Sequence, residues 1–188
     1  MHRALFTYVL LAILAVGCGQ SSGPLSDGDQ AAPDFSGVDC EGRVLSLHKL
    51  LATKPVILHF IEVNCPCSQL AAVHIQRLQD AYGQSVAVIG VINAQANDAK
   101  RWKARAGVGF VVLADPWCDV VRSYKVERSV HTVLISRTGK TARVYPRYSA
   151  DSLKDLNAQL AALLRIPAKS VSTEDAPVKP TAGCTFPE

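Results

Sequence analysis

The stretch PVILHFIEVNCPCS, residues 55–68, decides how the rest of the chain is interpreted. Its first half is a nearly continuous apolar run, which is typical of a strand covered on both faces. Asn64 ends that run, and Pro66 suits the first turn of a helix, where its missing N–H costs no hydrogen bond. The stretch therefore predicts a buried strand, a sharp turn and a helix, with Cys65 at the turn.

The predicted helix carries an apolar stripe at helical spacing, formed by Ala71, Ile75, Leu78 and Tyr82. Cys65 then lies at the start of this helix, where the helix dipole and the free N–H groups favour a thiolate over a thiol. That placement predicts an attacking sulfur. The alternative is that Cys65 is a buried packing residue.

The first residues of the chain are expected to lie outside the fold. Residues 1–17 combine a basic start with an apolar segment, the pattern of a secretory signal peptide. The Gly-Cys pair at its end resembles the lipobox of bacterial lipoproteins, which implies cleavage before Cys18 and lipid attachment to that residue. Residues 18–31 are then a flexible tether. The resemblance implies a protein that is lipid-anchored in the bacterial cell envelope, with its domain facing the periplasm or the exterior.

Composition narrows the function classes. Of the 188 residues 48% are hydrophobic, enough for a buried core, and the net charge of +4 is mild. We find no basic stripe with interleaved aromatic residues, so nucleic acid is not an expected partner. A glycine-rich phosphate loop is also missing, so no organic cofactor is expected.

Export implies an oxidising compartment for the cysteines that follow Cys18, which are Cys40, Cys65, Cys67, Cys118 and Cys184. Five is an odd number, so at least one has no partner within the chain.

The remaining segments predict a layered α/β domain over residues 32–166. The expected elements are a hairpin (38–47), strands (55–63, 85–92, 109–113, 130–136 and 141–145), helices (66–82, 95–106 and 117–124, the last with Cys118) and a final helix capped by Ser149 or Asp151. Residues 167–188 are polar and rich in proline, and we interpret them as an extended arm that carries Cys184.

Several motifs in this order resemble the thioredoxin-like superfamily, and within it the redoxin (AhpC/TSA) branch of peroxiredoxins and membrane-tethered thiol-disulfide oxidoreductases. They are APDF (32–35), the turn at Gly42, the spacing from Phe60 to Cys65-Pro66, Asp115-Pro116, and YKV with LISRTGK (124–126 and 134–140). The resemblance implies a thioredoxin-like three-layer α/β/α sandwich with a mixed central sheet. It also implies a thiol oxidoreductase whose partners are protein thiols and disulfides, or peroxide.

Under this resemblance Cys65 attacks, and a second thiol resolves the intermediate. With a disulfide substrate the intermediate is a mixed disulfide, and with peroxide it is a sulfenic acid. The second cysteine of the thioredoxin Cys-x-x-Cys motif falls on Ser68, and Cys67 is one place early. The resolving thiol is therefore Cys67 or Cys184, with Cys118 as a further possibility. Some exported members of the branch also carry a late Gly-Cys pair, as this chain does.

Two further positions depart from the family pattern. Peroxiredoxins place a hydroxyl residue three positions before the attacking cysteine, where this chain has Glu62, and a carboxylate there is expected to disfavour a thiolate. The position of the peroxiredoxin arginine or the thioredoxin cis-proline falls on Val130. These departures, with Ser68, keep open a non-catalytic thioredoxin-like binding domain. Two thiols one residue apart, with a histidine across the cleft, also keep open a copper site formed by Cys65, Cys67 and His131.

Overall fold

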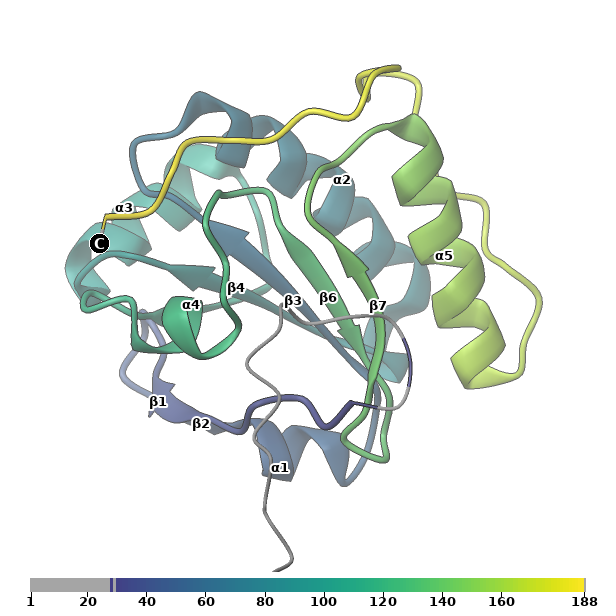
Figure 1. Cartoon of the computed structure of the whole chain (residues 1–188), viewed down its shortest axis with the longest axis horizontal. Helices are drawn as coiled ribbons and strands as arrows, with labels where there is room; N and C mark the ends of the chain where they lie inside the picture. Colours follow the sequence, from purple (N-terminus) through teal and green to yellow (C-terminus); the bar gives the residue numbers. More distant parts are fainter. Residues whose placement is uncertain (1–27, 29, 188) are drawn as a thin grey trace, which may run out of the picture.

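The computed structural model describes residue 28 and residues 30–187, and its centre is a mixed sheet (Figure 1). The strand order is β5-β4-β3-β6-β7. Strands β3, β4 and β5 are parallel, whereas β6 and β7 are antiparallel to their neighbours. The strands span Val56–Ile61 (β3), Ala87–Ile92 (β4), Val111–Ala114 (β5), Thr132–Ile135 (β6) and Thr141–Tyr145 (β7).

Helices and a small hairpin cover the two faces of this sheet. One face packs against α2 (Pro66–Tyr82), α3 (Ala96–Ala106) and α5 (Ala150–Leu164). The other face packs against α1 (Leu47–Leu51), α4 (Asp119–Ser123) and the hairpin of β1 (Ser36–Val38) and β2 (Val44–Ser46). A short 3-10 turn, η1 (Gly83–Ser85), follows α2. The predicted three-layer α/β/α sandwich with a mixed central sheet is therefore confirmed.

The predicted central strand is β3, and it is buried on both faces. Ile57 and Ile61 belong to the apolar cluster on the α2 side, and Leu58 and Phe60 belong to the cluster on the α1 side. This alternation explains the nearly continuous apolar run in the sequence, because successive side chains of a strand point to opposite faces.

Some predicted boundaries differ from the structure. The third strand begins at Val111 rather than at residue 109, and the short helix α4 begins after Cys118 instead of containing it. Val130 was expected within a strand, but it lies before β6 with a left-handed φ of 60°. The regular ladder with β3 begins only at Thr132, although the Val130 N–H still donates to the Phe60 carbonyl at 3.0 Å and the Phe60 N–H donates to the His131 carbonyl at 2.9 Å.

The predicted signal peptide and Cys18 lie outside the described residues, as does most of the predicted tether. The described end of the tether already contacts the sheet, because Ala31 forms an antiparallel bridge with Lys140 and Thr141 donates to the Gln30 carbonyl at 2.8 Å. Among residue 28 and residues 30–187, no helix has the length and apolar character needed to span a membrane.

Candidate active site at the start of α2

The sheet topology brings two chain segments to the same edge. Strand β3 ends at Ile61, and the turn that follows leads to Cys65 at the N-cap of α2. Strand β6 runs antiparallel to β3, so the residues that precede Thr132 lie at this same edge. The carboxyl ends of parallel strands are the common location of binding sites in α/β folds. The predicted placement of Cys65 before a helix is confirmed.

Hydrogen bonds fix the turn that carries Cys65. The Cys65 N–H donates to the Glu62 carbonyl at 3.1 Å, and the Cys65 carbonyl accepts from the Ser68 N–H at 3.0 Å. Asn93, at the end of β4, accepts from the Val63 N–H at 2.8 Å. Asn93 and its role were not predicted from the sequence. An asparagine directly after a predicted parallel strand could have indicated this residue, because binding sites lie at the carboxyl ends of such strands.

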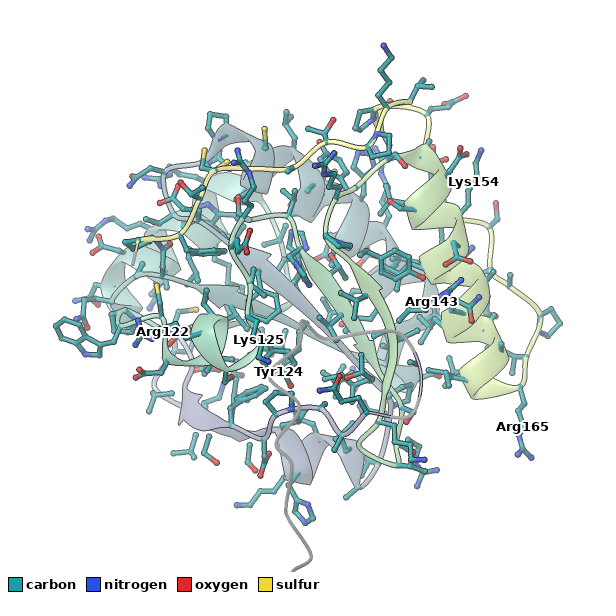
Figure 2. All side chains as sticks on the ribbon, in the orientation of Figure 1. Arg122, Tyr124, Lys125, Arg143, Lys154 and Arg165 are labelled. Atoms are coloured by element: carbon teal, nitrogen blue, oxygen red, sulfur yellow. The ribbon has the colours of Figure 1, made fainter. Side chains whose placement is uncertain are left out.

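The C-terminal arm reaches Cys65 from the other side. The Cys184 N–H donates to the Cys65 Sγ atom at 3.1 Å, across 119 positions of sequence. Figure 1 shows the arm as the yellow segment that runs from α5 across the molecule, and Figure 2 shows sulfur atoms beside it. Cys65 is 1% exposed, Cys67 is half-buried and Cys184 is exposed. The structure therefore brings Cys184 to Cys65, as the sequence analysis required of a resolving thiol.

A serine that the sequence analysis missed completes this environment. Ser129 is fully buried, and among the described residues its hydroxyl oxygen has no nitrogen or oxygen partner. It lies beside the Cys65 sulfur, which is the acceptor available to it. The sequence does carry a signal for Ser129. It is a polar residue directly before Val130, at the point where the chain returns to this edge of the sheet.

The Cys65 pKa is lowered to about 6. Burial alone would raise it, but hydrogen bonds to the sulfur outweigh burial. The donors are the Cys184 thiol, the Ser129 hydroxyl, and the N–H groups of Cys184 and Ser68. A thiol with this pKa is mostly thiolate at neutral pH, and the thiolate is the form that attacks disulfides and peroxides.

The two neighbouring thiols shift in the opposite direction. The Cys184 pKa rises to about 11, chiefly because its thiol donates to Cys65. The Cys67 pKa is raised by burial and by the charge of Cys65. The Cys65 thiolate thus faces two protonated thiols, those of Cys67 and Cys184. This arrangement fits one attacking sulfur and two candidates for the resolving sulfur. All five cysteines among the described residues are free thiols.

Glu62 does not prevent the lowering of the Cys65 pKa, and its expected effect on Cys65 stays a prediction. Its carboxylate accepts from the Asn64 N–H at 3.1 Å and lies 3.5 Å from the Asn93 amide nitrogen, and its charge raises the pKa of the Cys184 and Cys118 thiols. The lowered Cys65 pKa also argues against the non-catalytic alternative, for which an ordinary thiol pKa was expected.

The His131 side chain is half-buried. Burial lowers its pKa to about 4, and its ring stands edge-on to Phe60 with centroids 5.9 Å apart. Within the described part of the chain no group of three or more His, Cys, Asp or Glu side chains is placed to hold a metal ion. Copper binding by Cys65, Cys67 and His131 stays an untested prediction.

Comparisons with known proteins agree with this geometry. The model of the AhpC/TSA family matches residues 29–144. This chain belongs to the AhpC/TSA family. It is 25% identical over 145 residues to the thiol-disulfide oxidoreductase ResA of Halalkalibacterium halodurans, covering 72% of this chain and 82% of that protein.

Solved structures of similar fold come from both branches of the redoxins. A proposed thiol:disulfide interchange protein DsbE from Chlorobium tepidum aligns with a TM-score of 0.67 at 25% identity, over 74% of this chain and 99% of that chain. Peroxidoxin BcpB from Mycobacterium tuberculosis aligns with a TM-score of 0.64 at 21% identity, over 76% of this chain and 99% of that chain. The family and the relative named a thiol-disulfide oxidoreductase support the predicted enzyme class, and the solved structures support the fold.

Proposed function

We propose that this protein is an exported, membrane-tethered thiol-disulfide oxidoreductase that works through a Cys65–Cys184 disulfide. The observation that carries the proposal is the 3.1 Å hydrogen bond from the Cys184 N–H to the Cys65 sulfur. It brings the second thiol to the first without a Cys-x-x-Cys motif. The lipid on Cys18, the cell-envelope location and protein thiols and disulfides as partners belong to the same proposal.

The reaction has two exchange steps. The Cys65 thiolate attacks one sulfur of a substrate disulfide, forms a mixed disulfide and releases the other substrate sulfur as a thiolate. Cys184 then loses its proton to solvent or to the released thiolate, and attacks the Cys65 sulfur. The substrate leaves as a second thiolate, and the Cys65–Cys184 disulfide remains. Two electrons have passed from the protein to the substrate, and an external dithiol restores the reduced form.

Hydroperoxide reduction is a second candidate, favoured by the 1% exposure of Cys65. With the arm in place, a small oxidant reaches this sulfur more easily than a protein disulfide does. Cys65 would take one peroxide oxygen as a sulfenic acid and release an alcohol or water. Cys184 would then condense with the sulfenic acid, releasing water and giving the same disulfide.

The test uses the reduced full-length chain in detergent. One sample receives one equivalent of hydrogen peroxide and another receives glutathione disulfide, and loss of each thiol is followed by mass mapping. We expect loss of Cys65 to precede a Cys65–Cys184 disulfide, and the faster oxidant names the substrate class. Cys184→Ser should abolish that disulfide, whereas the matched Cys67→Ser variant should retain it. A Cys65–Cys67 disulfide in its place, or no faster reaction of Cys65 than of a free cysteine, would contradict the proposal.

A further inference from the structure

The end of the arm is seated on a specific edge of the fold. Arg128 and Thr185 form an antiparallel bridge, flanked by bonds from the Phe186 N–H to the Glu127 carbonyl at 3.0 Å and from the Ser129 N–H to the Cys184 carbonyl at 2.8 Å. The Arg128 guanidinium also donates to the Gly183 carbonyl at 3.0 Å. The arm therefore pairs through its backbone with the loop segment Glu127–Ser129, around one isolated β-bridge, in the way that a bound peptide pairs when it adds a strand.

Gly183 and Cys184 both lie opposite Ser129, because the Gly183 N–H donates to the Ser129 carbonyl at 3.1 Å. This two-to-one pairing is the geometry of a bulge, a feature that redirects groups next to active sites. Here it turns the Cys184 N–H toward the Cys65 sulfur. The bulge therefore explains how a docked strand supplies a hydrogen bond to the thiolate.

The position of Gly183 leaves little room for a side chain. A Cβ atom on Gly183 would lie 2.0 Å from the Ser129 hydroxyl oxygen, 3.2 Å from the Ser129 carbonyl carbon and 3.2 Å from the Cys65 sulfur. The Ser129 hydroxyl would have to rotate away from the Cys65 sulfur that it faces, and the Ser129 backbone and the sulfur would each have to shift by a few tenths of an ångström. A chain that docks here in the arm's register therefore fits best with glycine directly before its cysteine.

The next positions add a second preference. Cys184 and Thr185 are exposed, whereas Phe186 is 9% exposed and joins the apolar cluster that contains Tyr124 and Val126. The seated segment thus follows the pattern Gly-Cys-x-aromatic. Its glycine fits against Ser129, its cysteine meets Cys65, and its aromatic side chain is buried.

A protein disulfide must displace this segment, because the arm covers Cys65. Displacement would exchange the hydrogen bonds that the arm makes to the N–H and C=O of Ser129 for bonds to water, and an extended backbone that pairs with the same groups recovers them. An entering substrate that replaces the arm strand for strand restores every one of these bonds. A folded, compact substrate cannot do so.

We propose that the edge Glu127–Ser129 together with Cys65 is a docking site for extended polypeptide segments with glycine directly before the reactive cysteine, and that the arm is its built-in ligand. This inference rests on the proposed function and names its substrate class. The Cys65 thiolate attacks the docked cysteine's sulfur, and the other half of the substrate disulfide leaves as a thiolate with the bonding electron pair. The arm then returns and Cys184 resolves the mixed disulfide.

The first experiment measures selectivity between two peptides. The full-length protein carries Cys184→Ser and Phe186→Asp, so that the arm neither reacts nor stays anchored. The peptides are Thr-Ala-Gly-Cys-Thr-Phe-Pro and its counterpart with alanine before the cysteine, each with thionitrobenzoate on the cysteine. We expect Cys65 to release thionitrobenzoate from the glycine peptide about tenfold faster or more, after normalisation to the rate with mercaptoethanol. Equal normalised rates would overturn the docking site, and the same protein with Cys65→Ser gives the background.

The second experiment tests the built-in ligand. In the full-length chain, Gly183→Ala should slow formation of the Cys65–Cys184 disulfide about tenfold or more and speed alkylation of Cys65. Val178→Ala is the matched control, because that side chain is 86% exposed and lies in the arm outside the docked segment 183–186, so both rates should stay unchanged. If the unmodified chain forms no Cys65–Cys184 disulfide, the proposed function fails. If it does and Gly183→Ala forms it equally fast, the docking inference fails while the function stands.

Discussion

Cys65 and Cys118 have much in common, yet their chemistry diverges. Each lies at the N-cap of a helix, α2 and α4 respectively, and each is almost fully buried, at 1% and 2% exposure. The Cys65 pKa is lowered to about 6, whereas the Cys118 pKa is raised. Burial raises the pKa at both sites, so burial and the helix start do not explain the difference.

The difference lies in the groups that face each sulfur. Cys65 receives hydrogen bonds from Cys184 and Ser129, which come from two distant parts of the chain. Cys118 faces the carboxylates of Asp115, Asp119 and Glu62, which raise its pKa, whereas the Arg122 charge lowers it. Donors delivered by tertiary structure make the thiolate, and the position at a helix start is secondary.

The largest expected effect separates the two cysteines directly. Cys65→Ser should lower the rate of disulfide or peroxide turnover by at least about a thousandfold, because the attacking sulfur is gone. Cys118→Ser should keep turnover within about twofold, because a buried thiol with a raised pKa does not exchange. Steady-state consumption of the better oxidant from the mass-mapping experiment measures both variants. Loss of turnover in folded Cys118→Ser protein would show that Cys118 also takes part in the reaction, and would contradict this contrast.

Stability against pH tests the same contrast in the reduced protein. The folded pKa of Cys65 lies below its ordinary value of 9.0, at about 6. Its stabilisation is therefore complete above pH 9, declines as the pH falls, and is absent below pH 6. The unfolding equilibrium should shift by up to about a thousandfold across this window, since each pKa unit is a factor of ten.

Denaturant unfolding of the reduced chain and of Cys65→Ser, at pH 6 and at pH 8.5, measures this stabilisation. The difference between the two proteins should grow with pH. Cys118→Ser should show no such growth, because a raised pKa contributes no stability in this window. A constant difference between wild type and Cys65→Ser would show that the thiolate is not stabilised by the fold.

Ser129 supplies a smaller and more local test. Ser129→Ala removes one hydroxyl donor from the Cys65 thiolate, and we expect the Cys65 pKa to rise by about one unit. The pH dependence of iodoacetamide labelling at Cys65, read by mass mapping, gives that pKa. Ser68→Ala is the matched control, because the buried Ser68 hydroxyl accepts from the Glu62 N–H at 3.2 Å and the variant keeps its own N–H. An equal rise in both variants would assign the effect to packing.

Much of the fold could be predicted because the signals are local. The apolar run of β3, the proline after Cys65 and the stripe of α2 each specify one element within its own sequence. The boundary at Val130 could not be predicted. Its left-handed backbone is compatible with pairing through its N–H to the Phe60 carbonyl, a tertiary bond that no local pattern records.

The site was predictable only in part for the same reason. Cys65 could be found because a strand-to-helix turn is visible in the sequence. Ser129 and Gly183 act through contacts across more than fifty positions, and neither residue type is unusual where it stands. Sequence spacing predicts that Glu62 is near Cys65 but not that its carboxylate accepts from the Asn64 N–H.

The smallest expected effect tests whether charge or missing donors keep Cys118 protonated. The Asp115 carboxylate accepts from the N–H groups of Asp119 at 2.8 Å and Val121 at 3.0 Å, so Asp115→Asn removes a charge and weakens the start of α4. The Cys118 pKa should fall slightly but stay above neutral, because burial is its first cause. Iodoacetamide labelling of the native protein at pH 7 should therefore still mark Cys65 and spare Cys118.

Asp119→Asn is the matched control, since that exposed carboxylate also faces Cys118 without capping the helix. If Asp115→Asn alone made Cys118 as reactive as Cys65, a carboxylate would be what separates the two sulfurs, and the donors from Ser129 and the arm would lose their assigned role.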